Sequence, residues 1–245
     1  TPQTAARHRQ VAHAPGLWPF AKNPGATQLN IDHHLDAATL VAYAAGTLGE
    51  AFNVVVASHL DWCAACAEDA RRAALLGGEL IGNLDGTPVS EECRSKTLSM
   101  LDTATLHRFP KTPASQGEVP EPLGHLLGGK SLAELAWKRK APGLALYDLP
   151  LSETSSGKLF LMRIGPGTAM PEHGHGGEEI TLILSGAYND KFGRYARGDV
   201  ADLDESIEHQ PIVEPDSACI CLVATEAPTR FKSWPARLLQ PLIGI

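Results

Sequence analysis

The sequence lacks the features that would place the chain in a membrane or on nucleic acid. No apolar run reaches the roughly twenty residues that a membrane-spanning helix needs. An excess of positive charge is absent too, because 21 Lys and Arg stand against 28 Asp and Glu, for a net charge of -7. A chain with this balance is not expected to coat phosphates. We therefore expect no membrane contact and no direct nucleic-acid binding.

An export signal is also missing from the first thirty residues. They contain Arg7, Arg9 and Lys22 but no acidic residue, and they lack the apolar segment of a signal peptide. Cysteine is scarce and odd in number, at five. In a chain without an export signal this predicts free thiols or metal ligands rather than a disulfide framework. We expect a cytoplasmic protein.

The first half of the chain has a helical pattern. Residues 1–30 hold Pro and Gly without a period and predict an irregular arm. Residues 31–109 predict a small bundle of about four helices, and Asp36 is placed to cap the first of them. A bundle of this size is near the lower limit for a self-sufficient core, so a bound metal would help it. The helices are expected at 36–46, 47–63, 64–80 and 90–109.

The second half has the pattern of strands. Residues 110–122 contain four prolines and predict a linker. From residue 123 to 245 the apolar runs are short and separated by Gly, Pro, Asp and Asn, notably at 158–167, 178–188 and 218–225, which predicts a sandwich or barrel. No internal repeat is present, so the fold class is α+β with two different domains.

The stretch HLDWCAACAED combines a histidine with a Cys-x-x-Cys pair. His59, Cys63 and Cys66 can share one face of a helix or of a helix end. A structural zinc site needs a fourth ligand, which His33 or His34 could supply. Two alternatives stay open. One is a dithiol redox centre, which favours a strand-helix-strand context, and the other is two buried thiols in an Ala-rich bundle.

The stretch GTAMPEHGHGGEEITLILSG carries a second set of metal-ligand types. On a strand His173 and His175 would point to one face, and Glu179 could close on the same point from the next strand. His209, further along, could complete the set. Such ligands suit Zn, Fe, Mn or Ni. The glycines at the two ends of the stretch predict a two-stranded hairpin, and the alternative is a solvated loop rich in His and Glu.

Together the two motifs resemble those of the ChrR-type anti-sigma factors. That family joins a zinc-binding helical domain to a C-terminal cupin β-barrel, and the resemblance covers about residues 31–245, including LVAYAAGTLGEAF. The stretch before His209 departs from the usual cupin motif, because it lacks Pro-x-Gly. The resemblance implies zinc at His34, His59, Cys63 and Cys66, with His34 favoured over His33 by its spacing, and a second metal, zinc in this family, at His173, His175, Glu179 and His209.

The resemblance implies a regulator of transcription. Residues 31–109 would hold an ECF-type (extracytoplasmic-function) sigma factor inactive, and the cupin domain would be needed for release under singlet oxygen or related oxidants. The rival is a metal-dependent cupin enzyme, of dioxygenase or isomerase type, which would not need the helical domain. The fourth helix is the candidate for partner contact, through Leu98, Leu101 and Thr105, although the same residues could close the bundle core.

Two groups could receive the oxidant. Cys219 and Cys221 would share one face of a strand, where neighbours two apart are too distant for an unstrained disulfide. We expect them to be small core residues. Imidazole reacts readily with singlet oxygen, so we expect the second set of histidines to be the sensor.

Overall fold

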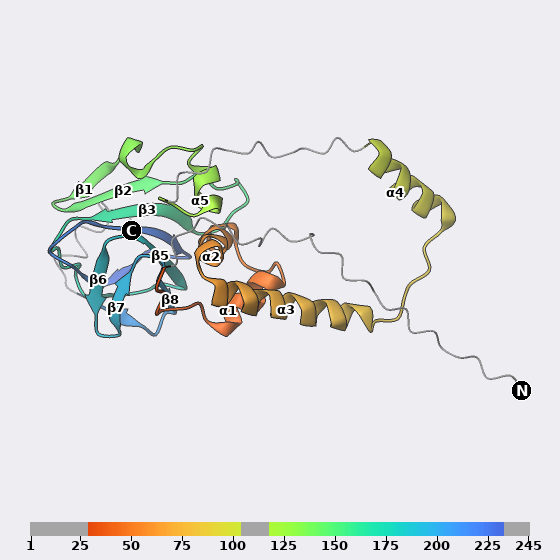
Figure 1. Ribbon diagram of the computed structural model, residues 1–245, viewed down its shortest axis with the longest axis horizontal. Coiled ribbons are helices and arrows are strands. Elements are labelled where there is room, and N and C mark those ends of the chain that lie inside the picture. The colour runs from red at the N-terminus through yellow and green to blue at the C-terminus, as the bar shows by residue number, and fades with distance from the viewer. Residues whose placement is uncertain (1–28, 104–117, 233–245) are drawn as a thin grey trace, which may run out of the picture.

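The computed structural model describes residues 29–103 and 118–232, in which helices come first and strands follow (Figure 1). No helix within these two ranges is both long and apolar enough to cross a bilayer. The helices are α1 (Ala37–Ala44), α2 (Glu50–Trp62), α3 (Ala64–Gly82), α4 (Glu91–Thr103), α5 (Glu121–Leu126) and the short 3-10 helix η1 (Leu132–Glu134).

The first three helices begin and end largely where the sequence predicts. The Asp36 carboxylate accepts the Ala38 N–H at 2.8 Å and caps α1, and Gly46, at φ 69°, follows its end. Cys63 ends α2 and also caps α3, because its sulfur accepts the N–H of Cys66. These helices pack on one another and bring the Cys-x-x-Cys pair to their junction.

The strands form three antiparallel sheets. The largest has the order β1-β2-β3-β11-β5-β8, and two three-stranded sheets have the orders β10-β6-β7 and β12-β4-β9. The runs predicted as strands at 158–167, 178–188 and 218–225 contain β3, β5 and β11, which lie side by side. The strands are β1 (Lys138–Ala141), β2 (Leu144–Asp148), β3 (Lys158–Ile164), β4 (His173–Gly174), β5 (Glu179–Ser185), β6 (Ala187–Asp190), β7 (Gly193–Ala196), β8 (Val200–Leu203), β9 (Glu208–His209), β10 (Ile212–Val213), β11 (Cys219–Thr225) and β12 (Arg230–Phe231).

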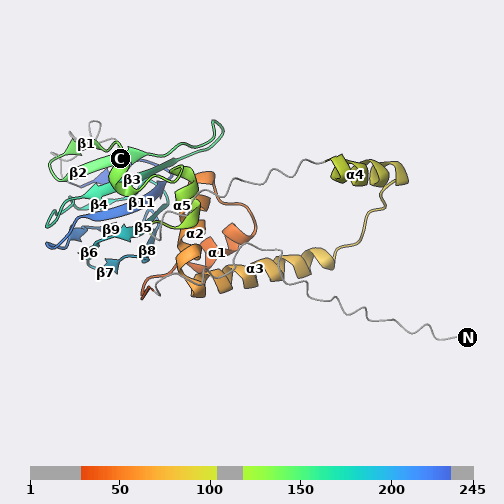
Figure 2. The same ribbon diagram turned by 45° about the horizontal axis from the view of Figure 1, so that its top comes forward.

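Two hydrophobic cores lie on opposite faces of the six-stranded sheet. One face is covered by α2, so Val55 of the helix and Leu182 of β5 belong to a single core (Figure 2). Successive strand side chains point to opposite faces. The next residue of β5, Ile183, therefore belongs to the second core, which also contains Tyr188 and Cys221. The helical and sheet parts share buried surface rather than meeting only through a linker.

The fourth helix does not join the bundle, contrary to the four-helix prediction. Every α4 side chain that the structure describes is exposed, and α4 stands apart from α1–α3 in both views (Figures 1 and 2). Its sequence carries few apolar residues at helical spacing, so little burial would accompany packing. Further along, α5 begins at Glu121, inside the stretch predicted as a linker.

The hairpin predicted between the two end glycines of the His-rich stretch does not form. β4 pairs with β9 and β12, whereas β5 pairs with β11 and β8. The two strands therefore lie in different sheets, and β4 is only two residues long. The histidines and Glu179 approach one another across sheets, not across a turn.

Candidate metal centres

Four side chains from three segments meet at the junction of α2 and α3. His59 comes from the last turn of α2, Cys63 and Cys66 from the helix junction, and His34 from the segment before α1. One donor atom from each lies within 4.8 Å of the others. The structure thus brings together all four residues of the first predicted set.

The spacing of these donor atoms suits a tetrahedral ion. Cys63 Sγ lies 3.3 Å from His34 Nδ1, and Cys66 Sγ lies 3.3 Å from His59 Nε2 and 3.5 Å from His34 Nδ1. A tetrahedron with zinc bonds of about 2.0 to 2.3 Å has edges of about 3.3 to 3.8 Å. The donors therefore already occupy positions close to the corners that zinc would require.

His33, the alternative fourth ligand, lies elsewhere. Its Nε2 is 3.1 Å from the carbonyl oxygen of Arg194, and its ring stacks on Tyr195 at 3.9 Å between centroids. His34 is therefore the member of the pair that faces the two cysteines.

The surroundings favour a thiolate at Cys63. A hydrogen bond from Cys66 lowers the pKa of Cys63 to about 3, against the effect of burial, and His59 acts in the same direction. The Cys66 thiol, as the donor to Cys63 and a buried group, has its pKa raised. Thiolates are the form that binds metal. A helix and not a strand precedes the pair, and two imidazoles contact the sulfurs, which weighs against the dithiol redox alternative.

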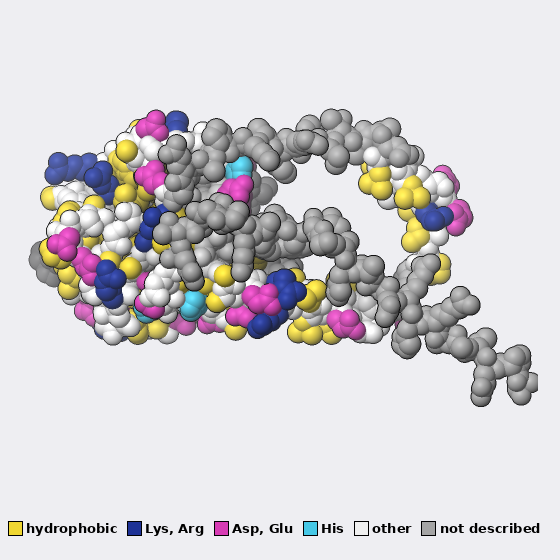
Figure 3. All heavy atoms as spheres, in the orientation of Figure 1, with side chains coloured by type: hydrophobic (Ala, Val, Ile, Leu, Met, Phe, Trp, Pro, Cys, Tyr) yellow, Lys and Arg dark blue, Asp and Glu magenta, His cyan; other side chains and the backbone are white. Residues whose placement is uncertain are grey.

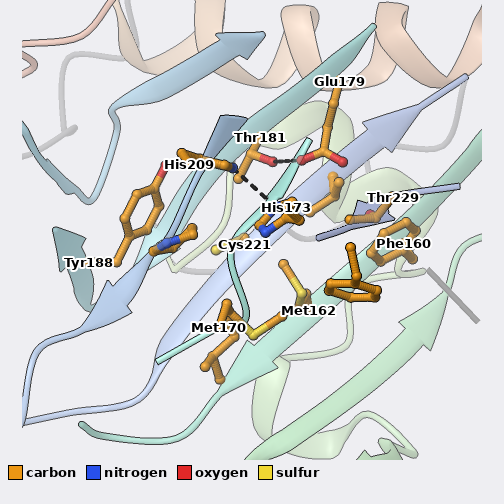
Figure 4. Close-up of a pocket in the computed structure, with 14 residues that line it drawn as sticks. Phe160, Met162, Met170, His173, Glu179, Thr181, Tyr188, His209, Cys221 and Thr229 are labelled. Atoms are coloured by element: carbon orange, nitrogen blue, oxygen red, sulfur yellow. Dashed lines mark hydrogen bonds between the residues drawn. The ribbon is translucent and has the colours of Figure 1, made fainter. Parts of the chain in front are cut away.

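The second cluster consists of three buried histidines. His173 on β4 is paired in register with His209 on β9, and His175 follows β4 directly. One ring nitrogen from each lies within 4.8 Å of the other two. Figure 4 shows His173 and His209 pointing toward each other on one wall of a pocket.

The hydrogen bonds of two of these rings point their Nε2 atoms at the same place. His173 Nδ1 donates to the carbonyl of Pro171 at 2.8 Å, and His209 Nδ1 donates to the carboxylate of Asp190 at 2.8 Å. Burial lowers the pKa of His173 to about 4, so this ring is neutral at pH 7. The Nε2 atoms of the two rings lie 3.1 Å apart and face each other. A cation between them would be held by both nitrogens.

His175 is buried, and its two ring nitrogens lack hydrogen-bond partners among the described residues. Neither ring nitrogen makes a hydrogen bond with a described residue, although Nδ1 lies 3.4 Å from Glu179 Oε2. An unpaired buried polar group costs about 1 to 3 kcal/mol, which coordination would offset. The three rings therefore fit a bound divalent metal, which would be held by His173, His175 and His209 and would supply Lewis acidity there.

Glu179, the predicted fourth member, lies beside the three histidines and outside their tight cluster. Its carboxylate accepts from the Thr181 hydroxyl at 3.4 Å (Figure 4), and its Oε2 lies 3.4 Å from Nδ1 of His175. Burial acts to raise the pKa of Glu179, but the close contact with the His175 imidazole and the nearby His173 and His209 outweigh it, and the pKa is lowered. The ionised carboxylate is thus the form that a metal would meet.

A cavity of about 550 Å³, counted with its open mouth, adjoins this second cluster. His173, His209 and Glu179 form one side, and apolar side chains including Met162, Met170 and Phe160 form the other (Figure 4). Asp190, the hydrogen-bond partner of His209, was not predicted from the sequence. Asp190 precedes His209 by 19 positions, and no sequence motif connects the two.

Comparison with known proteins identifies the family. The model of the ChrR cupin-like domain matches residues 130–228. The anti-sigma-E factor ChrR of Cereibacter sphaeroides is 37% identical over 217 residues, which cover 89% of this chain and 100% of that protein. The chain belongs to the ChrR family of anti-sigma factors. The resemblance inferred from the two motifs is thereby confirmed.

A solved structure supports the same ChrR-family assignment. A chain in the crystal structure of Rhodobacter sphaeroides SigE in complex with the anti-sigma ChrR matches with a TM-score of 0.67 and 36% identity. The match covers 80% of this chain and 99% of that chain. The chain that contains the two candidate metal centres is thus a member of the ChrR family.

Proposed function

We propose that this chain is an anti-sigma factor that binds and inhibits an ECF-type sigma factor and releases it under oxidative stress. Membership of the ChrR family supports the first part, as does the solved complex of a related ChrR with SigE. The observation that carries the proposal is the uncovered apolar surface of α3 and α4.

The exposed apolar side chains lie in two places, the C-terminal end of α3 and the second half of α4. Leu80 and Ile81 near the end of α3 are 64% and 71% exposed, and Leu98 and Leu101 of α4 are 50% and 67% exposed. Hydrophobic side chains gather at these two places in Figure 3. Soluble monomers rarely leave large apolar patches open unless a partner covers them. The sigma factor is the proposed cover. Thr105, also predicted to contact it, lies outside the described residues.

In this proposal the domain boundaries follow the sequence pattern. Residues 31–109 are the anti-sigma domain, with a structural zinc ion at His34, His59, Cys63 and Cys66. Residues 123–245 are the cupin domain, whose sheets together make the cupin barrel. Its metal is zinc, with Fe, Mn or Ni as the other candidates, and Glu179 joins the three histidines as a ligand.

Release is proposed to begin at the cupin metal cluster. Oxidation of His173, His175 or His209 would remove a ligand and leave Glu179 as a buried, unpaired carboxylate, which adds a desolvation cost. Cys219 and Cys221 are the other candidate receivers. Their sulfurs lie 3.6 Å apart where β11 shifts register, but both are fully buried in the second core. The cavity reaches His173 and His209 and also Cys221, so access does not separate the two candidates. We favour the histidines, because imidazole reacts readily with singlet oxygen and its oxidation would remove a metal ligand.

Co-expression with the sigma factor encoded beside this chain tests the proposal. The two proteins are expected to copurify, with zinc detected in the complex by elemental analysis. If the sigma factor did not copurify, the anti-sigma proposal would be wrong. The rival function, a cupin metalloenzyme, would then take its place, and the cavity beside three histidines is the observation that favours it.

A further inference from the structure

The turn between β7 and β8 reaches the first metal centre from the sheet side. The Nδ1–H of His59 donates to the carbonyl of Gly198 at 3.0 Å, and this bond is buried. A carbonyl can only accept, so the proton sits on Nδ1 and the lone pair of Nε2 faces Cys66. A residue 139 positions away in the sequence thus sets the tautomer of a candidate ligand.

The neighbouring carboxylate, Asp199, holds the segment that carries the other histidine. One of its oxygens accepts the backbone N–H groups of Asp32 at 2.7 Å and His33 at 3.0 Å, and its other oxygen accepts the N–H of Ala196 at 2.8 Å. Asp199 is buried. The N–H of Val200 also donates to the His33 carbonyl at 3.3 Å. His33, the residue immediately before His34, is therefore held through both its backbone N–H and its backbone C=O.

The same turn is bonded to the strand that leads to the second centre. Gly198 N–H donates to the carbonyl of Ile183 at 2.9 Å, and Ile183 N–H donates to the carbonyl of Asp199 at 3.0 Å. Ile183 lies on β5, the strand that begins at Glu179. The turn therefore contacts both histidine segments of the first centre and the strand of the second.

We infer that Asp199, together with the Gly198 carbonyl, is a positioning element of the first metal centre. It presents His34 and His59 to the two cysteines in the arrangement that a tetrahedral ion needs, so metal binding requires little further ordering. It also connects the two centres through β5. The inference rests on the proposed zinc centre and adds to it an outer shell supplied by the sheet.

The full-length protein loaded with Co²⁺ provides the test. A thiolate-to-cobalt charge-transfer band is expected from Cys63 and Cys66, since the proposed ligands of the second centre are three histidines and Glu179. Asp199→Asn removes the charge and puts an N–H₂ where an acceptor is needed. We expect Co²⁺ and Zn²⁺ affinity at the first centre to fall by about ten-fold or more. We also expect the band to change and the metal to pass to a chelator sooner.

Asp204→Asn is the matched control. This exposed carboxylate is near Asp199 in sequence and accepts from Ser206 in its own turn. It makes the same charge change without touching the first centre, so the band and affinity should stay as in the wild type. If Asp199→Asn matched this control, the inference would be wrong. If the wild type itself lacked the band, the proposed zinc centre would be wrong instead.

A second variant covers the case in which Asp199→Asn does not fold. Gly198 has φ 97°, and a Cβ there would lie 2.9 Å from Ile31 Cγ1. Gly198→Ala keeps the carboxylate but displaces the turn, so it should shift the cobalt band and speed metal release in the same direction. A folded Gly198→Ala protein, checked by circular dichroism, that kept the wild-type band and release rate would also overturn the inference.

Discussion

At the scale of single residues, Cys63 connects folding to metal binding, because it caps α3 and contacts His34. We predict that replacing Cys63 and Cys66 with Ser removes zinc from the first centre. The unfolded chain holds no preformed site, so metal binding stabilises the folded state; without it, helix content and melting temperature should fall and sigma-factor binding should be lost. Circular dichroism measures helix content and melting temperature, and copurification measures sigma-factor binding. Cys93→Ser, at an exposed cysteine on α4, is the control and should leave stability and sigma-factor binding unchanged. Wild-type stability in the double variant would contradict the zinc proposal.

The ligand types could be predicted from the sequence, but their supporting residues could not. The spacing of His59, Cys63 and Cys66 predicts that they lie close together, because positions three and four apart at a helix end are neighbours regardless of the tertiary fold. The partner of His209, Asp190, and the partner of the His33 backbone, Asp199, carry no such local signal. Their roles depend on strand pairing between distant segments, which periodicity does not determine.

At the scale of elements, α4 is a helix without a covering neighbour among the described residues. We predict that Leu98→Glu with Leu101→Glu weakens sigma-factor binding strongly and leaves the melting temperature nearly unchanged, because these side chains are exposed in the free protein. Pull-down and thermal unfolding give the two readouts. Lys96→Glu, on the opposite side of the helix by its 3.6-residue period, should leave binding intact. A large loss of stability in the double variant would support the alternative that α4 closes a core.

Long periodic elements could be predicted, and short ones could not. Residues 158–167 and 218–225 read as strands because their apolar runs suit a sheet buried on both faces, and β3 and β11 are found there. β4 and β9 have two residues each and no periodic pattern, yet they bring His173 and His209 together. The failure of the hairpin prediction has the same cause.

At the scale of the whole molecule, the helical and sheet parts share one core, and Leu222 of β11 lies in it against α2. We predict that Leu222→Ala lowers the free energy of unfolding by about 2 to 5 kcal/mol. Hydrogen exchange should then speed up in α2 as well as in β11, because the two bury a common surface. Ile212→Ala, at a half-exposed residue of β10, should cost much less. Faster exchange confined to the sheet would show that the parts are energetically separate.

The last prediction concerns how an oxidant signal crosses the molecule. The second candidate metal cluster adjoins the core on the face of the sheet away from α2, so a change there must pass through the strands to reach the proposed sigma-binding surface. We predict that cells with His173→Ala and His175→Ala lose the response of a sigma-dependent reporter to singlet oxygen. The ligands that the oxidant would remove are already gone, so the reporter should stay active without the oxidant. Cys219→Ser with Cys221→Ser should respond normally, because these buried thiols serve as core residues. Immunoblots of both variants control for protein level. A normal response in the histidine variant, with none in the cysteine variant, would make the thiols the receiver.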